Sequence, residues 1–127
     1  MNHLVQAALA AREKAHAPFS KFKVGAAIED EHGHIYTGCN IENASYGLTL
    51  CAERVAVFKA FSEGAGKLLR IAVVADTPTP TPPCGACRQI LWEFMGDVEV
   101  TLANLSNQQE TVKMSEILPR AFDASFL

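Results

Sequence analysis

The sequence has no apolar run long enough to cross a membrane and no excess of positive charge. No stretch approaches the roughly 18 consecutive apolar residues of a transmembrane helix, and the first residues lack the charged and apolar regions of a secretory signal. Lys and Arg number 11 against 14 Asp and Glu, which gives a net charge of −3. This balance argues against a basic surface for nucleic acid or anionic lipid. We expect a soluble cytoplasmic protein with neither a membrane nor a nucleic acid as partner.

The chain also has no excess of glycine or proline, which take 8 and 6 of its 127 positions. That composition excludes collagen-like and low-complexity chains. Hydrophobic residues make up 49% and charged residues 20%, so the chain can bury a core. Its length is that of one ordinary domain and leaves no room for a second core. We expect a single domain over residues 1–127.

The prolines are concentrated in one segment. Four of the 6 fall within residues 77–83, whose sequence is TPTPTPP. Each proline fixes φ, lacks a backbone N–H and restricts the residue before it, so this segment can form neither a helix nor a paired strand. We expect a stiff, extended loop there.

Upstream of this loop, the apolar pattern predicts a helix, a hairpin and a second helix. Asn2 is a potential cap for a helix that we expect to reach about His16. Apolar residues alternate over 22–28, a polar turn follows, and 35–39 can return as the second strand. Residues 52–62 are helix formers that are apolar on most sides, which indicates a mostly buried helix.

Downstream, strands and helices alternate. Residues 71–75 are a continuous apolar run, typical of a central strand covered on both faces. Residues 87–95 have the pattern of an amphipathic helix, and 98–102 alternate as a strand. We expect a short strand near 111–113 and a last helical turn capped by Ser115. This order predicts an α/β fold, a three-layer α/β/α sandwich with a mixed sheet of about five strands.

Three of the four cysteines lie where predicted helices begin. Cys51 precedes the first of these helices, and Cys84 and Cys87 form a CxxC pair at the start of the second. A helix N-terminus lowers thiol pKa values and so favours the thiolates that bind metals. The histidines have no motif spacing with these cysteines. The pattern therefore predicts three thiolate ligands around one ion.

Three protein ligands without an obvious fourth are typical of a catalytic zinc, whose open position holds water. Such a site needs an acid/base group beside the water that does not bind the metal. Glu53 is the candidate, two residues after Cys51. Because residues i and i+2 of a helix do not face each other, this arrangement works only if Cys51 occupies the cap position.

Other interpretations of the cysteines remain open at this point. A lone CxxC is found in redox proteins, although such motifs lack a third cysteine followed by Glu. A closed structural zinc site is a stronger rival, with Cys39 as the fourth ligand, and it would make the protein a binding module. A closed site would leave Glu53 without a catalytic role. Cys39 is equally well explained as a small buried hydrophobic residue on a strand.

The CxE and PCxxC motifs resemble those of the zinc-dependent nucleobase deaminases, in which the first ligand is often His. The match to the small homotetrameric cytidine deaminases extends over nearly the whole chain. The matching segments are 24–27 (VGAA), 38–44 (GCNIENA), 51–54 (CAER), 83–89 (PCGACRQ) and 117–119 (ILP).

The resemblance implies one Zn²⁺ per subunit, held by Cys51, Cys84 and Cys87, and a hydrolase that converts cytidine and deoxycytidine to uridine and deoxyuridine in pyrimidine salvage. Glu53 is then the catalytic proton carrier. Three thiolates leave the zinc cluster at about −1. The resemblance implies that Arg54 compensates this charge through a hydrogen bond to a ligand sulfur.

The resemblance also implies a set of residues that bind the nucleoside. Asn40 and Glu42 would bind the ribose hydroxyls, and Phe22 and the backbone around Ala52 would border the base. The remaining two, Tyr46 and Phe122, resemble residues that reach a neighbouring subunit's site in a homotetramer with shared active sites. A Glu42 carboxylate beside the sugar would repel a 5′-phosphate and so favour free nucleosides over other cytosine-containing substrates. The roles of Arg88 and Cys39 stay open.

Overall fold

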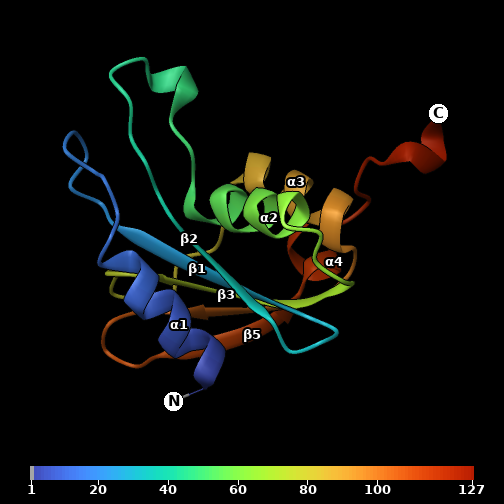
Figure 1. Ribbon diagram of the computed structural model, residues 1–127, viewed down its shortest axis with the longest axis horizontal. Coiled ribbons are helices and arrows are strands. Elements are labelled where there is room, and N and C mark those ends of the chain that lie inside the picture. The colour runs from blue at the N-terminus through green and yellow to red at the C-terminus, as the bar shows by residue number, and fades with distance from the viewer. Residues whose placement is uncertain (1) are drawn as a thin grey trace.

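Five strands, four α-helices and two short 3-10 turns make up residues 2–127, the part of the chain that this computed structural model describes (Figure 1). The elements are α1 (His3–Arg12), β1 (Val24–Asp30), β2 (Ile35–Cys39), η1 (Tyr46–Leu48), α2 (Ala52–Ser62), β3 (Leu68–Ala75), α3 (Gly85–Met95), β4 (Glu99–Ala103), β5 (Gln109–Lys113), α4 (Met114–Ile117) and η2 (Ala124–Phe126). Within residues 2–127, no helix has both the length and the apolar character that a membrane span requires.

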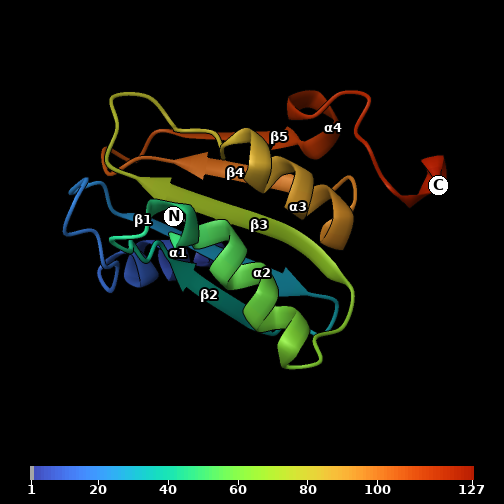
Figure 2. The ribbon, with the colours of Figure 1, turned by 90° about the horizontal axis from the view of Figure 1, so that it is seen from above.

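The strands form one sheet in the order β2-β1-β3-β4-β5 (Figure 2). Strands β3 and β4 are parallel, and the chain between them passes through α3, as a parallel pair requires. Every other neighbouring pair is antiparallel. The predicted hairpin and the predicted mixed sheet are confirmed, and the apolar run at 71–75 lies in the central strand.

Helices cover both faces of the sheet (Figure 1). Successive side chains of a strand point to opposite faces. On β1, Ala26 and Ile28 join the buried cluster under α2 and α3, whereas Ala27 joins the cluster under α1. The three-layer α/β/α arrangement is therefore confirmed.

Helix α2 lies close to the sheet because β2 has a glycine beneath its first turn. A Cβ atom added at Gly38 would lie 2.5 Å from the carbonyl oxygen of Ala52 and 2.5 Å from the amide nitrogen of Ala56. Gly25 permits the same close approach of α1, since its added Cβ would lie 2.0 Å from the Ala8 carbonyl oxygen. The start of α2 is thus held against the sheet by backbone contact.

Helix α1 is shorter than the sequence predicts. It ends at Arg12, whereas the expected end was about His16. The amides of Lys14 and Ala15 bond to carbonyls three residues back, and the amide of His16 donates to the Asn40 carbonyl at 3.0 Å. Pairing with the segment after β2 therefore replaces the last helical turn.

The expected cap of the last helix is also wrong. Lys113 is the N-cap of α4, and its amide donates to Glu116 Oε1 at 3.1 Å. Ser115 lies inside the helix, where its amide and hydroxyl both donate to the Asp97 carboxylate, at 2.8 and 2.9 Å. The Ser115 side chain thus binds Asp97, in the turn before β4, and does not cap the helix.

Candidate metal centre and active site

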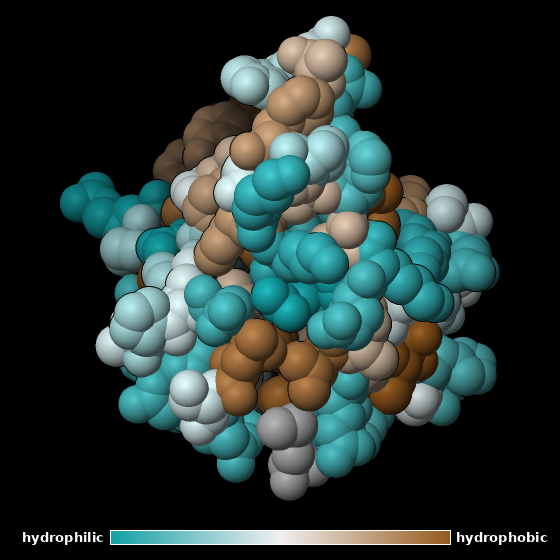
Figure 3. Space-filling view, turned by 90° about the vertical axis from the view of Figure 1, so that its left-hand side faces the viewer, coloured by the Kyte–Doolittle hydropathy of each residue, from teal (hydrophilic) through white to brown (hydrophobic). Residues whose placement is uncertain are grey.

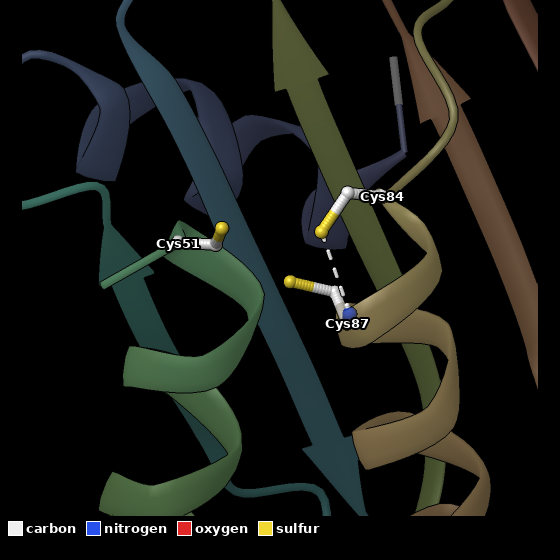
Figure 4. Close-up of side chains that lie close together, drawn as sticks. All are labelled: Cys51, Cys84 and Cys87. Atoms are coloured by element: carbon white, nitrogen blue, oxygen red, sulfur yellow. Dashed lines mark hydrogen bonds between the residues drawn. The ribbon is translucent and has the colours of Figure 1, made fainter. Parts of the chain in front are cut away.

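Three thiols from two helix starts meet at one point (Figure 4). Cys51 is the N-cap of α2, with φ −75° and ψ 153°, and Cys84 is the N-cap of α3, with φ −66° and ψ 165°. Cys87 follows in the first turn of α3 and is fully buried. Their sulfur atoms all lie within 4.8 Å of one another. Cys51 therefore has a non-helical backbone conformation. This was the condition under which the side chains of Cys51 and Glu53 can face the same metal site.

The geometry of the three sulfurs suits zinc. Tetrahedral coordination with Zn–S bonds of about 2.3 Å places the sulfurs about 3.8 Å apart, so small side-chain rotations complete the set. Within residues 2–127, Cys39 lies outside this cluster, half-buried on β2. The closed four-cysteine site is therefore contradicted, and a coordination position stays open for a non-protein ligand.

One of the three thiols, that of Cys51, is prepared to lose its proton. The hydrogen bond from Cys87 and the nearby Arg54 guanidinium lower the pKa of Cys51 to about 5. The contact with the Cys51 thiolate and burial raise the pKa of the Cys87 thiol. The amide of Cys87 donates to Cys84 Sγ at 3.5 Å. Because metal ligands must be deprotonated, a divalent cation that binds here displaces the protons of these thiols.

Arg54 supplies positive charge to this cluster. Its Nη2 donates to Cys51 Sγ at 3.3 Å and to the Thr49 carbonyl at 3.4 Å. The hydrogen bond to Cys51 raises the pKa of the guanidinium further. Its Nε is buried and has no hydrogen-bond partner within residues 2–127. A buried donor of this kind favours an anionic neighbour, as three thiolates around a divalent ion provide.

Glu53 is a buried carboxyl beside the thiols. It lies in the first turn of α2, and only 4% of its surface is exposed. Burial raises the pKa of Glu53 to about 7, and the negative charge of Cys51 acts in the same direction. A carboxyl with such a pKa both gives and takes protons near neutral pH.

The thiols and Glu53 lie in the wall of a cavity of about 270 Å³. The cavity is lined by Phe22, Val24, Asn40, Thr49, Leu50, Cys51, Ala52, Glu53, Val73, Ala75, Thr81, Pro82 and Cys84. Its size is close to the lower end of the range for small-molecule sites, roughly 300–1,000 Å³. A second cavity, of about 370 Å³, is lined by Phe19, Ser20, Glu42, Tyr46 and Thr49. Thr49 borders both, so the two cavities adjoin.

Asn40 and Glu42, the predicted ribose-binding residues, are ordered by the chain segment before β1. The Asn40 amide donates to the Phe22 carbonyl at 2.7 Å and accepts from the Val24 amide at 2.9 Å. The Glu42 carboxylate accepts from the amides of Phe19 and Ser20, at 2.9 and 3.1 Å, and from the Ser20 hydroxyl. These hydrogen bonds, led by those from Ser20, lower the pKa of Glu42, so this carboxyl is charged at neutral pH.

Three predicted substrate-binding residues do not line the metal cavity of their own chain: Glu42, which borders the second cavity, and also Tyr46 and Phe122. Tyr46 borders the second cavity and is 72% exposed, with an edge contact to the Phe19 ring. Phe122 lies in the C-terminal segment, is 58% exposed and stacks on Phe126. The roles of Tyr46 and Phe122 stay predictions, because they concern a neighbouring subunit.

Sequence reasoning missed seven residues that line the metal cavity: Val24, Thr49, Leu50, Val73, Ala75, Thr81 and Pro82. The last two belong to the proline-rich loop between β3 and α3, which leads directly into Cys84. A signal for them was present, since a rigid segment next to a ligand borders whatever the metal binds. No comparable signal marked Thr49.

Zinc hydrolases keep one coordination position open and hold an acid/base group beside it. In the nucleobase deaminases among them, two ligands come from a PCxxC segment. The remaining ligand lies earlier in the sequence, and the acid/base is the Glu two residues after it. The site and the fold together point to that class.

Comparisons with known proteins agree. The sequence model of the family described as "Cytidine and deoxycytidylate deaminase zinc-binding region" matches residues 1–103. The cytidine deaminase of Halalkalibacterium halodurans is 53% identical over 122 residues, which are 95% of this chain and 92% of that protein. The crystal structure of cytidine deaminase from Burkholderia pseudomallei superposes with a TM-score of 0.92 at 49% identity, and the match covers 96% of this chain and 100% of that one. For the Mycobacterium tuberculosis enzyme the TM-score is 0.82 at 40% identity, over 96% of each chain.

The chain therefore belongs to the family of zinc-dependent cytidine deaminases, and it is an enzyme. Cys51, Cys84 and Cys87 are its zinc ligands, as the motif spacing predicts.

Proposed function

We propose that this enzyme deaminates cytidine and deoxycytidine by hydrolysis, forming uridine and deoxyuridine with release of ammonia, as a step of pyrimidine salvage. The observation that carries the proposal is the buried Glu53 carboxyl, which shares a small cavity with the Cys51 and Cys84 ligands. In this proposal the base occupies the metal cavity of about 270 Å³, and the sugar occupies the adjoining cavity of about 370 Å³ that contains Glu42.

In this mechanism Glu53 moves the protons. Zinc, when bound, lowers the pKa of a water molecule to about 7 and so supplies a hydroxide nucleophile for C4 of cytosine. Glu53 takes a proton from this water and passes it to N3 of the base, and it then takes the proton of the hydroxyl group at C4 and passes it to the exocyclic amine, which leaves as ammonia. A pKa of about 7 for Glu53 supports both transfers, because neither protonation state is costly at neutral pH. Arg54 holds the Cys51 sulfur and offsets the negative charge of the ligands.

Substrate recognition uses the two adjoining cavities. Phe22 and Ala52 border the base in the metal cavity, and Asn40, which lines the same cavity, contacts the sugar. Glu42 accepts hydrogen bonds from the ribose hydroxyls in the second cavity, where Ser20 now donates to it. Its negative charge disfavours a 5′-phosphate.

Replacing Glu42 with Gln tests this assignment. We expect KM for cytidine to rise about tenfold, the effect of one charged hydrogen bond, and the preference for cytidine over cytidine 5′-monophosphate to shrink. Steady-state rates for both substrates measure this. The control is Glu93→Gln, which makes the same change at an exposed position on α3. An unchanged ratio of kcat/KM values for the two substrates would contradict the role of Glu42.

The activity itself is tested by following the ultraviolet absorbance of cytidine and deoxycytidine with purified enzyme. We expect loss of the cytidine band, its abolition by a strong zinc chelator and its return with added zinc. Cytosine, cytidine 5′-monophosphate and single-stranded DNA serve as competing substrates. Faster turnover of any of these would mean that the enzyme acts on another cytosine-containing substrate.

We also propose that the enzyme is a homotetramer with shared active sites. The loop with η1 stands out from the body above α2, and the C-terminal segment extends from the other end (Figure 1). Figure 3 shows hydrophobic side chains on the first protrusion, where Tyr46 is 72% and Leu48 70% exposed. Phe122 and Phe126 are similarly exposed on the second, at 58% and 69%. Ordered, exposed aromatic groups of this kind support burial against other subunits.

Sedimentation equilibrium tests the assembly. A tetramer has about four times the 13.7 kDa of the chain, and we expect Phe122→Ala to weaken it and to raise KM. A monomer that is fully active would contradict shared sites.

We further propose that residues 1–127 act as one catalytic domain and that the enzyme works in the cytoplasm. One sheet passes through both clusters of buried side chains, which supports a single folding unit. The site needs three reduced thiols, and the reducing cytoplasm maintains them.

A further inference from the structure

The proline-rich loop, residues 77–83, is both a wall of the active site and the support of a zinc ligand. Thr81 and Pro82 line the metal cavity, and Cys84 follows directly. Yet within residues 2–127 no backbone-to-backbone hydrogen bond of the loops and turns involves this segment. Four of its residues are prolines, which have no N–H to donate. The loop must therefore be held through its carbonyl groups and side chains.

Within the loop, two threonine hydroxyls form a short chain of hydrogen bonds. Thr81 Oγ1 donates to Thr77 Oγ1 at 2.6 Å, and Thr77 Oγ1 donates to the Thr79 carbonyl at 2.6 Å. These bonds order the loop internally. They do not connect it to the rest of the molecule.

Asn104 makes that connection at the start of the loop. It follows β4 and lies where the turn to β5 runs beside the loop (Figure 2). Its Nδ2 donates to the carbonyls of Thr77 and Pro78, at 3.0 and 3.3 Å, and to Gln108 Oε1 at 2.6 Å. Its Oδ1 accepts from the amides of Ser106 and Gln108, at 3.0 and 2.9 Å. Asn104 is only 3% exposed, so water cannot easily replace these bonds.

Arg88 makes the connection at the end of the loop. Its Nε donates to the Pro83 carbonyl at 2.7 Å, and its Nη1 donates to the Ile117 carbonyl at 2.7 Å. The guanidinium therefore joins the residue before Cys84 to the end of α4. Arg88 had no assigned role from the sequence.

We propose that Asn104 and Arg88 are positioning residues that fix the two ends of the proline-rich loop, and with it Cys84 and the Thr81–Pro82 wall of the substrate cavity. Neither residue lines the cavity. Asn104 acts through the Thr77 and Pro78 carbonyls, and Arg88 acts through the Pro83 carbonyl. Loss of either anchor lets the loop move while the sheet and the helices keep their own hydrogen bonds.

Two consequences follow from this arrangement. A mobile loop loosens Cys84, which speeds zinc loss, because the removal of groups that orient a ligand costs roughly 10–100-fold in metal affinity. A mobile Thr81–Pro82 wall weakens substrate binding. The first consequence depends on the zinc site alone, and the second also rests on the proposed function.

The Asn104→Asp variant removes the hydrogen bonds that Asn104 makes to the proline-rich loop and keeps those that its side-chain oxygen accepts within the β4–β5 turn. An Asp keeps the oxygen that accepts from Ser106 and Gln108, so the β4–β5 turn is retained. It lacks the N–H groups that hold Thr77 and Pro78 and places a carboxylate against their carbonyls. The matched control is Asn107→Asp in the same turn, whose oxygen accepts from Gln109 and which is exposed.

Arg88→Lys tests the second anchor with the charge kept. A lysine keeps the charge but offers one nitrogen in place of the two that donate to the Pro83 and Ile117 carbonyls. Its control is Arg70→Lys, which alters an arginine on β3 that pairs with Glu29.

The experiment measures zinc transfer from each holoenzyme to a coloured chelator, together with kcat and KM for cytidine and the melting temperature. For Asn104→Asp and Arg88→Lys we expect zinc release about tenfold faster than wild type and a severalfold higher KM, whereas both controls match wild type. Release rates equal to those of the controls overturn the proposal, even if the melting temperature falls, because that result means a structural role only. If the wild type fails to deaminate cytidine, the proposed function is wrong, and the zinc-release comparison still decides the positioning role.

Discussion

Replacing Glu53 with Gln is expected to lower kcat for cytidine by at least roughly a thousandfold while the zinc content stays at that of the wild type. The amide has the size of the carboxyl but cannot carry a proton, and general acid/base catalysis contributes about 10²–10⁴-fold. Glu53 serves two successive proton transfers in the proposed mechanism, which places the loss at the upper end of that range. Zinc is retained because Glu53 is not among the ligands.

The measurement is single-turnover and steady-state ultraviolet kinetics beside metal analysis of the same samples. Glu63→Gln is the matched control, since Glu63 is exposed at the other end of α2. We expect that variant to keep the wild-type kcat. A zinc-loaded Glu53→Gln enzyme with more than about a tenth of wild-type activity would show that another group moves the protons.

Replacing Cys87 with Ala is expected to remove both zinc and activity. Two thiolates remain, which is one ligand fewer than catalytic zinc sites use. Cys87 is fully buried, so no external side chain can take its place. We expect less than about a tenth of the wild-type zinc after dialysis and a lower melting temperature, because zinc binds the folded state in preference to the unfolded one.

Cys39→Ala serves as the control for this loss. Cys39 is half-buried on β2 and lies outside the sulfur cluster, so we expect full zinc occupancy. Zinc loss in this variant would mean that Cys39 contributes to the site. Full zinc occupancy in Cys87→Ala would overturn the three-thiol assignment.

The sequence predictions were accurate where an element depends on interactions between residues close in sequence. They were less accurate where it depends on contacts with distant segments. Helix α2 was predicted with its observed bounds, Ala52–Ser62, because its composition and the Gly64 signal are local. The end of α1 was predicted too late, because His16 bonds to Asn40, which lies far along the chain. Strand β5 is longer than expected, since pairing with β4 extends it beyond its own apolar residues.

The zinc ligands and the placement of Glu53 were likewise accessible from sequence. Cys51, Cys84 and Cys87 are spaced so that each stands at or near a helix start, and helix N-termini favour thiolates. The CxE spacing required Cys51 at the cap, and the structure has it there. The position of each residue at its helix start is local and depends on helix geometry, whereas the meeting of the two helix starts depends on the packing of α2 and α3.

The sequence by itself therefore determined the elements, the layer order and the chemistry of the metal site, since periodicity and motif spacing are short-range properties. Only the tertiary structure decided that Cys39 is left out of the cluster and that Thr81 and Pro82 line the cavity. It alone also placed Asn104 and Arg88 as anchors of the loop before Cys84. The physical reason is that these relations join segments distant in sequence, and packing of the sheet and helices sets which of their polar groups meet.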